Sequence, residues 1–102
     1  MRVIVAIRID INESGAGAWF HREMKFDFMP MKEMKFEFAL KGKGMPNYHK
    51  HELFMVTEVC WVEKNNTVYI RLALDREALG LVKTSDFDLR VWKVGEPDPW
   101  RK

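Results

Sequence analysis

The stretch RVIVAIRIDI, residues 2–11, decides the fold class, because apolar residues recur along it at every second position. A period of two residues is typical of a β-strand that buries one of its faces. That face carries only β-branched residues, which strands favour: Val3, Val5, Ile7, Ile9 and Ile11. We therefore expect a strand whose five-residue face forms one wall of the hydrophobic core.

A ten-residue repeat follows, and we interpret it as a hairpin. The segment EMKFDF at residues 23–28 recurs as EMKFEF at residues 33–38, and Pro30 interrupts the strand between the two copies. Ten residues are too few for a solenoid unit, so the copies are better interpreted as the two arms of one hairpin. Its inner face would carry Met and Phe, and its outer face Lys, Glu and Asp.

Charge selects the register of this predicted hairpin. With Met29 opposite Glu33, the cross-strand pairs are all favourable: Lys25–Glu37, Asp27–Lys35, Phe26–Phe36 and Phe28–Met34. Such pairs each contribute roughly 0.2–1 kcal/mol, and like charges directly opposite each other cost a similar amount. A slip by two residues sets like charges opposite each other, so we expect the first register.

A second hairpin is predicted after a basic loop. Residues 51–63 form a long strand, residues 64–67 a turn around Asn65 and Asn66, and residues 68–74 the return strand. Asn tolerates the positive φ of a two-residue turn, which sets four opposing pairs: Val59–Leu72, Trp61–Ile70, Val62–Tyr69 and Cys60–Arg71. Both faces are largely apolar, so we expect this hairpin at the centre of a sheet or beneath a second cover.

The remaining residues complete a single domain, residues 1–94. One short helix is expected near residues 76–80, where Asp and Gly suit its two ends, and alternation over residues 87–94 predicts a last strand. Two prolines remove backbone donors from residues 95–102, which we expect to form a loose tail. The sequence therefore predicts an all-β fold, a six-stranded antiparallel sandwich or small barrel built from hairpins.

Composition places the chain among soluble globular proteins and excludes several classes. Of its 102 residues, 47% are hydrophobic and 31% charged, which is the globular range. The net charge of +2 is too small to indicate a nucleic-acid partner by itself. One cysteine allows no internal disulfide, and no apolar run approaches the roughly 20 residues of a membrane span. We expect a cytoplasmic protein without a membrane partner.

The predicted topology also indicates where a site would lie. If the strands run up and down in chain order, the tight turns at Pro30 and Asn65 share one end of the molecule. The longer connections, residues 12–21, 41–50 and 75–86, share the other end, and such loops usually carry function. That end would collect the histidines with aromatic and basic side chains: His21, His49, His51, Trp19, Tyr48, Lys41, Lys43 and Lys50.

Metal binding is one candidate function of that end. His49 and His51 point to the same side of an extended segment, so they offer two nitrogens to a divalent metal, with His21 as a third. The run from His49 to Val56 resembles the first metal motif of the cupins, which implies a ligand role for both histidines. The second cupin motif, a Pro-Gly turn with a later His, is absent after residue 60. The alternative is that three loop histidines merely fall near each other, and no other cofactor is expected.

Nucleic acid or another anion is a second candidate. Aromatic residues interleaved with lysines stack bases and neutralise phosphates on small β-domains, and the charge would come from Lys25, Lys35, Lys41, Lys43 and Lys50. At the loop end the binding surface would consist of Trp19, Lys41, Lys43, Tyr48 and Lys50. Against this, the Phe residues of the repeat share a face with Met, which is typical of a core. The lysines beside them alternate with acidic residues that cancel their field. A solvated face whose charges oppose edge aggregation is the better supported interpretation.

Covalent catalysis has little support in this sequence. Ser14 and Ser85 occur in no nucleophile-elbow pattern. Cys60 lies among apolar neighbours in the middle of a predicted strand, which is typical of a buried, inert thiol. We therefore name no catalytic residue and favour a protein that is not an enzyme.

Protein association is the function that the sequence favours most. Residues 53–74 carry apolar side chains on both faces, and seven methionines and seven phenylalanines add adaptable contact surface. A second layer of the same chain could cover these apolar faces, and a dimer could cover them equally well. We expect a binding or protein-interaction module whose partner is another protein or a second copy. The alternative is a metal- or anion-binding protein that uses the loop end around His49 and His51.

Overall fold

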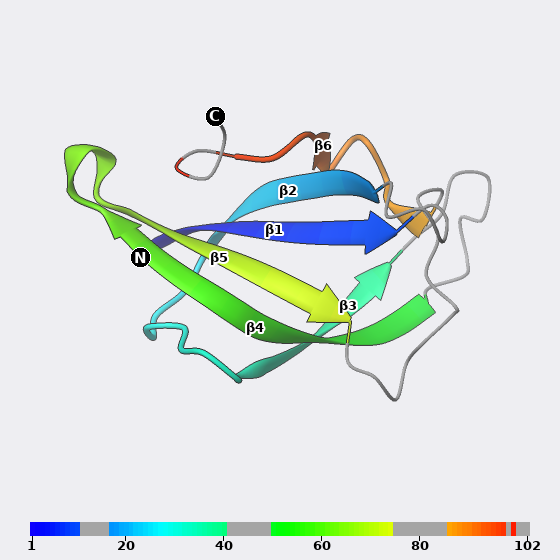
Figure 1. The fold of residues 1–102 in the computed structure, drawn as a ribbon, viewed down its shortest axis with the longest axis horizontal. Helices are drawn as coiled ribbons and strands as arrows, with labels where there is room; N and C mark the ends of the chain where they lie inside the picture. Colours follow the sequence, from blue (N-terminus) through cyan, green and yellow to red (C-terminus); the bar gives the residue numbers. More distant parts are fainter. Residues whose placement is uncertain (11–16, 41–49, 75–85, 98, 100–102) are drawn as a thin grey trace.

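One six-stranded sheet holds every strand of the computed structural model, which describes residues 1–10, 17–40, 50–74, 86–97 and 99 (Figure 1). The spatial order of the strands is β3-β4-β5-β1-β2-β6. Their bounds are β1 Arg2–Asp10, β2 Gly17–Lys25, β3 Lys35–Leu40, β4 Lys50–Val62, β5 Thr67–Leu74 and β6 Lys93–Val94. One complete 3-10 turn, η1, spans Glu63–Asn65. The all-β prediction is confirmed, whereas the helix near residues 76–80 lies outside the described residues.

β1 lies inside the sheet and is buried on both faces. Its predicted core face is confirmed for the four described members, none more than 2% exposed: Val3, Val5, Ile7 and Ile9. On the opposite face Ile4 and Ala6 are buried as well. β2 pairs with β1 in the antiparallel sense, but β5 pairs with it in the parallel sense. The prediction of a wholly antiparallel sheet is therefore wrong, because a strand covered on both faces accepts a parallel neighbour.

The predicted hairpin between the two copies of the repeat does not form. β2 pairs with β1 and β6, whereas β3 pairs with β4, where Lys35 lies opposite Met55 and Glu37 opposite Leu53. The connection between β2 and β3 instead crosses from one part of the sheet to the other. Its last turn takes Glu33 to a φ of 71°, and the Glu33 N–H donates to the Val56 carbonyl at 2.8 Å.

Aromatic residues of the repeat nevertheless meet inside the curled sheet. The ring of Phe26 stacks on that of Phe36, with centroids 5.4 Å apart and planes 13° from parallel. From Phe36 the ring contacts continue in sequence through Phe38, Trp92 and Phe87 to Phe20, each with centroids 4.3–6.2 Å apart. We call these six residues the aromatic seam: Phe20, Phe26, Phe36, Phe38, Phe87 and Trp92.

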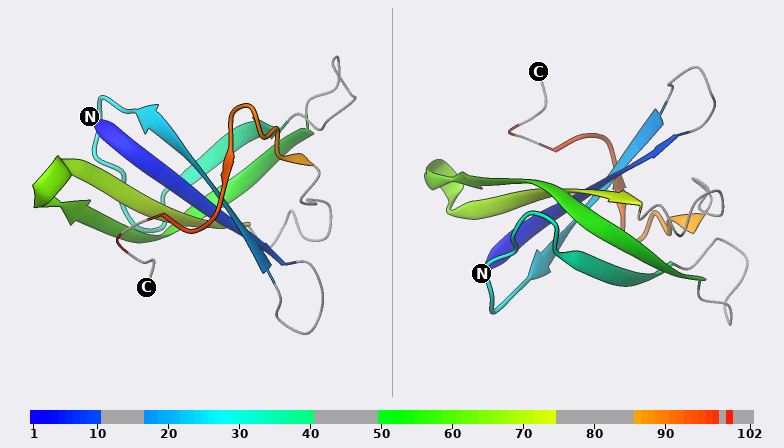
Figure 2. Two further views of the ribbon diagram at one scale, coloured as in Figure 1. Left: turned by 90° about the horizontal axis from the view of Figure 1, so that it is seen from above. Right: turned by 60° about the horizontal axis from the view of Figure 1, so that its bottom comes forward.

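The aromatic seam explains why the sheet curls without becoming a barrel. Figure 2 shows β1 and β2 crossing over β3 and β4 at a steep angle, with the two parts of the sheet facing each other. In the described residues β3 forms ladder hydrogen bonds with β4 alone, so no backbone pairing closes the circle. Side chains of the seam join the two parts instead. The small-barrel prediction is therefore wrong, and the fold is a single open mixed sheet.

The hairpin of β4 and β5 forms, but its register differs by two residues from the prediction. Val59 lies opposite Ile70 rather than Leu72. Four residues connect the strands instead of two, because η1 is followed by Asn66 in the left-handed conformation, at a φ of 48°. From Glu58 to Val62 this even shift preserves the faces, so the division of side chains in that part is as predicted. Beyond the bulge Val56 lies opposite Leu72, so the two faces of β4 are exchanged there. A bulge between Val56 and Glu58 interrupts the ladder.

The predicted last strand is mostly a turn. The carbonyl of Asp88 accepts hydrogen bonds from the N–H groups of Val91 and Trp92, at 3.0 and 2.8 Å, and its carboxylate accepts one from the N–H of Arg90 at 2.9 Å. Asp commonly forms such local turns. The bonds and charge of Asp88 also raise the pKa of the Arg90 guanidinium. Leu89, within the predicted strand, is therefore part of the turn and 65% exposed, and only Lys93–Val94 form β6.

Removing a ring from the aromatic seam should destabilise the whole fold. Phe38 is 8% exposed and contacts the rings of Phe36, Phe54 and Trp92, so Phe38→Ala should lower the free energy of unfolding by about 3–5 kcal/mol. Urea denaturation followed by circular dichroism measures this change. Phe28→Ala is the matched control, because that ring is 44% exposed and its loss should cost less than about 1 kcal/mol. Equal losses would show that the seam does not hold the sheet together.

Candidate functional site

The strand ends that flank the three long connections lie at one end of the sheet (Figure 1). Asp10 lies opposite Gly17, Leu40 opposite Lys50, and the parallel pairing of β1 and β5 brings Leu72 level with Ile7. We call this the connection end. The β2–β3 crossing and η1 lie at the other end, the turn end. The strand ends thus separate as predicted, but the tight turn predicted at Pro30 is instead the β2–β3 crossing, residues 26–34.

Most of the predicted site lies outside the described residues. Four of its residues are not described at all: Lys41, Lys43, Tyr48 and His49. Lys50 and His51 belong to β4, but their side chains are not described. Their convergence on a metal or an anion stays a prediction. Within the described ranges, no group of three or more His, Cys, Asp or Glu side chains is arranged to hold a metal ion.

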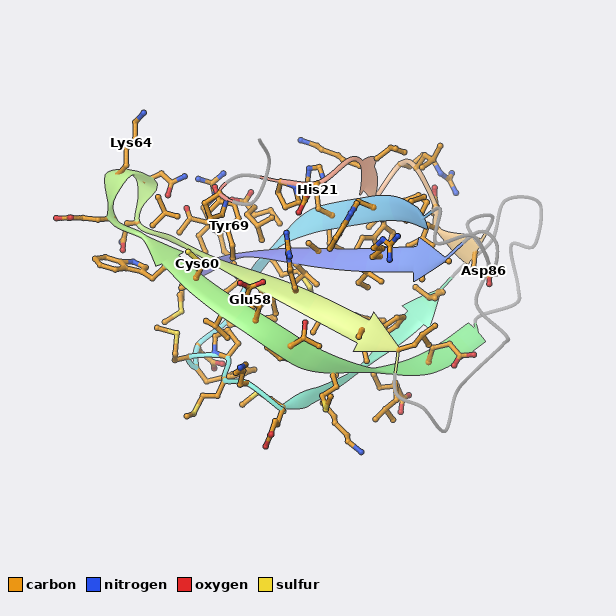
Figure 3. All side chains as sticks on the ribbon, in the orientation of Figure 1. His21, Glu58, Cys60, Lys64, Tyr69 and Asp86 are labelled. Atoms are coloured by element: carbon orange, nitrogen blue, oxygen red, sulfur yellow. The ribbon has the colours of Figure 1, made fainter. Side chains whose placement is uncertain are left out.

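Trp19 and His21 are described, and both belong to β2. His21 lies opposite Ala6, and its Nδ1 donates to the carbonyl of Gly95 at 2.8 Å. The guanidinium of Arg71 lies 5.0 Å from the centre of the Trp19 ring. Figure 3 shows His21 beside the segment that follows β6. These two residues therefore bind parts of their own chain on the outer face of the sheet.

Residues 95–97 run across this outer face and are held at several points. The N–H of Gly95 donates to the Trp19 carbonyl at 2.8 Å, and Glu96 forms an ion pair with Arg71. Arg71 also pairs with Glu58, which lies directly opposite it on β4, at 3.4 Å. Pro97 is buried. The boundary of the domain at residue 94 and the looseness of the whole tail stay predictions, since residues 98 and 100–102 are not described.

A polar pocket of about 520 Å³ opens beside this segment. Its walls include more basic than acidic side chains: Arg2, His21, Arg22 and Lys93 against Glu23 and Glu96. Arg2 forms an ion pair with Glu23, and Glu96 is engaged by Arg71. The guanidinium of Arg22 lies 5.4 Å from the Trp92 ring. Both acidic members of the wall are thus paired with arginines, and Glu96 and Pro97 of the segment form part of the wall itself.

Breaking the ion pair of Glu96 should loosen residues 95–97 without unfolding the protein. A partly exposed ion pair contributes at most about 1 kcal/mol, so Glu96→Gln should speed amide exchange at Gly95 by up to about fivefold. Hydrogen exchange followed by NMR measures this rate. Glu23→Gln, which removes the ion pair with Arg2 instead, is the control and should leave the Gly95 rate unchanged. An unchanged rate in Glu96→Gln would show that Arg71 does not retain the segment.

The turn end carries the largest group of exposed apolar side chains that we can assign to one region. Phe28, Met29 and Met31 come from the β2–β3 crossing and are 44%, 49% and 64% exposed, and Trp61 of β4 is 56% exposed. We call these four residues the turn-end patch. A shallow pocket of about 420 Å³ adjoins the patch at Met31, and its other walls are Pro30, Lys32, Glu58 and Val59. The ring of Phe28 stacks on Phe26, so the patch continues directly into the aromatic seam.

An unpaired strand edge runs beside this patch. β4 has 13 residues and β3 has six, and pairing on that side of β4 ends where Val56 exchanges hydrogen bonds with Glu33 and Met34. Among the described residues, 57–62 of β4 pair with β5 alone. In such a strand every second residue directs its N–H and C=O away from its neighbour. We call residues 57–62 the free edge of β4.

The sequence contained one signal for this site. The long predicted strand of residues 51–63 exceeds either six-residue copy of the repeat, so some of its length had to lack a partner on one side. Charge pairing within the repeat instead favoured a hairpin between its two copies, which leaves the partners of the long strand undefined. It also placed Phe28 on the inner face of a hairpin, whereas Phe28 lies beyond the last residue of β2.

Comparison of the chain with protein-family models, with curated proteins and with solved structures finds no match. Within the ranges that the structure describes, no helix has the length and apolar character needed to cross a membrane. The function must therefore be inferred from the residues of this chain alone.

Proposed function

We propose that this chain is a protein-interaction module that binds its partner at the turn end, through the turn-end patch and the free edge of β4. The observation that carries the proposal is the exposure of Met31 and Trp61, at 64% and 56%, beside a strand edge that has no neighbouring strand among the described residues. Met and Trp are enriched in protein interfaces, and Met adapts its shape to different partners.

Proteins usually protect an exposed strand edge with charges, prolines, bulges or a covering segment. β3 follows this rule, because Lys35 and Glu37 are exposed on its solvent face. The free edge of β4 begins at a bulge but then continues through Val59 to Val62, with only Glu58 charged. An extended segment of a partner would pair with this edge and place its apolar side chains against the patch, which is the mode known as strand addition.

Most of the apolar side chains on the two faces of residues 53–74 are covered by other parts of the same chain. Phe54 and Val56 are at most 1% exposed inside the curled sheet, and Tyr69 on the outer face is 8% exposed. Trp61 is the exception on this hairpin, which restricts the proposed interface to the turn end. Phe26, Phe36 and Phe38 of the repeat lie within the aromatic seam, which supports a core role for them rather than a platform for stacking nucleic-acid bases.

Selection from a random-peptide display library tests this function. The immobilised wild-type chain should enrich extended peptides with apolar residues at alternate positions, because side chains on one face of an added strand would contact the patch. A variant with Met31→Ser and Trp61→Ser should bind the selected peptides at least about tenfold more weakly, since buried aromatic anchors dominate interface energies.

Leu89→Ser is the matched control for this experiment. Leu89 is 65% exposed, like Met31, but it belongs to the Asp88 turn and not to the turn-end patch. Its replacement should leave peptide affinity unchanged. Peptides that bind the double variant as tightly as the wild type would refute the assignment of function to the turn end.

A further inference from the structure

The free edge of β4 has a property that a one-sided peptide site does not need, namely charges of opposite sign near its two ends. Glu58 lies near its beginning, and Lys64 lies just beyond its end, in η1. Figure 3 shows Lys64, Cys60 and Glu58 following one another along the hairpin. Lys64 is exposed, and the Glu58 side chain is 47% exposed although it pairs with Arg71.

Antiparallel pairing of this edge with an identical edge brings unlike charges together. Two copies related by a two-fold axis place each residue i opposite the residue that mirrors it about the axis. With the axis at Trp61, Cys60 of each copy lies opposite Val62 of the other. Lys64, two residues beyond Val62 in η1, is then on the side of Glu58 of the other copy, and this approach occurs twice. Cross-strand pairs of opposite charge stabilise a sheet, whereas like charges destabilise it.

The same axis also joins the apolar groups. Val59 lies two residues from Trp61, so the two side chains share one face of the strand. That face is the one on which Val59 lines the shallow pocket with Met31. Both Trp61 rings would meet at the axis, with Val59 and Met31 of the two copies on either side. The exposed indoles and the unpaired backbone groups would be covered in one contact.

We propose that the partner at the turn end is a second copy of this chain, joined by antiparallel pairing of the free edge of β4 with its equivalent. The two open sheets then form one continuous sheet across the two-fold axis. This inference rests on the proposed function, because it uses the same patch and edge and adds the identity of the partner and the register.

Charge reversal tests the pairing and its register. Glu58→Lys sets a new lysine against Lys64 of the other copy, and Lys64→Glu sets a new glutamate against Glu58. Each variant alone should therefore dimerise about tenfold more weakly than the wild type. An equimolar mixture of the two variants restores an unlike pair and should recover association close to the wild-type value. Sedimentation velocity over the micromolar range measures the dissociation constants, and circular dichroism verifies folding.

The mixture separates the proposed contact from damage within one chain. Glu58→Lys also removes the ion pair with Arg71, but mixing two variants does not repair a defect inside either chain. Glu63→Lys is a matched control, because Glu63 lies level with Val59 in this register and meets no lysine there. It should weaken the dimer by less than about twofold.

Each outcome decides the inference separately from the proposed function. A wild-type chain that stays monomeric overturns the dimer, and peptides selected at the turn end would still uphold the function. The pairing of β4 with β4 is overturned if neither charge reversal changes the dissociation constant of the dimer. It is also overturned if mixing the two variants does not restore association. If a selected peptide also converts the dimer into monomers, peptide and second copy share one site, as proposed.

Discussion

The architecture depends on burial of the aromatic seam. A sheet that curls far enough to enclose a core usually completes a barrel, in which backbone hydrogen bonds join the first and last strands. Here rings from both parts of the sheet perform that task, beginning with the stack of Phe26 on Phe36. Burying one such side chain stabilises a fold by roughly 1.5–3 kcal/mol, and an aromatic pair adds about 0.5–1.5 kcal/mol. Side-chain packing therefore determines the curvature, while the strand edges stay separate.

These magnitudes explain which features could be predicted from the sequence. The core face of β1 and the hairpin of β4 and β5 follow from period-two alternation, which reports burial directly. The prediction of a β2–β3 hairpin was wrong because it relied on charge pairs worth less than about 1 kcal/mol each. Burial of Phe26 and Phe36 in the seam contributes more than these pairs. Asp88 and Asn66 caused smaller errors, since each forms a local turn that alternation does not report.

The candidate site was harder to predict than the fold, for a geometric reason. Periodicity indicates which face of a strand is apolar, but it does not indicate where the neighbouring strand ends. The turn-end patch exists because β3 stops at Lys35 while β4 continues to Val62. Phe28 and Trp61 have the spacing of core residues, yet they lie beyond the part of the sheet that covers such faces. Strand pairing, which depends on residues far apart in the chain, decides their exposure.

The parallel pairing of β1 with β5 has a consequence for the order of folding. Val68, opposite Val3, follows it by 65 residues, whereas the strands paired in β1–β2, β3–β4 and β4–β5 follow each other directly in the chain. Contacts between distant segments carry a large loop-closure entropy and form slowly. The chain is thus composed of an N-terminal pair of strands and a later meander of three, which dock along the β1–β5 boundary. During synthesis β1 and β2 would leave the ribosome long before β5 is made. The edge of β1 that pairs with β5 therefore stays unpaired until β5 has been synthesised.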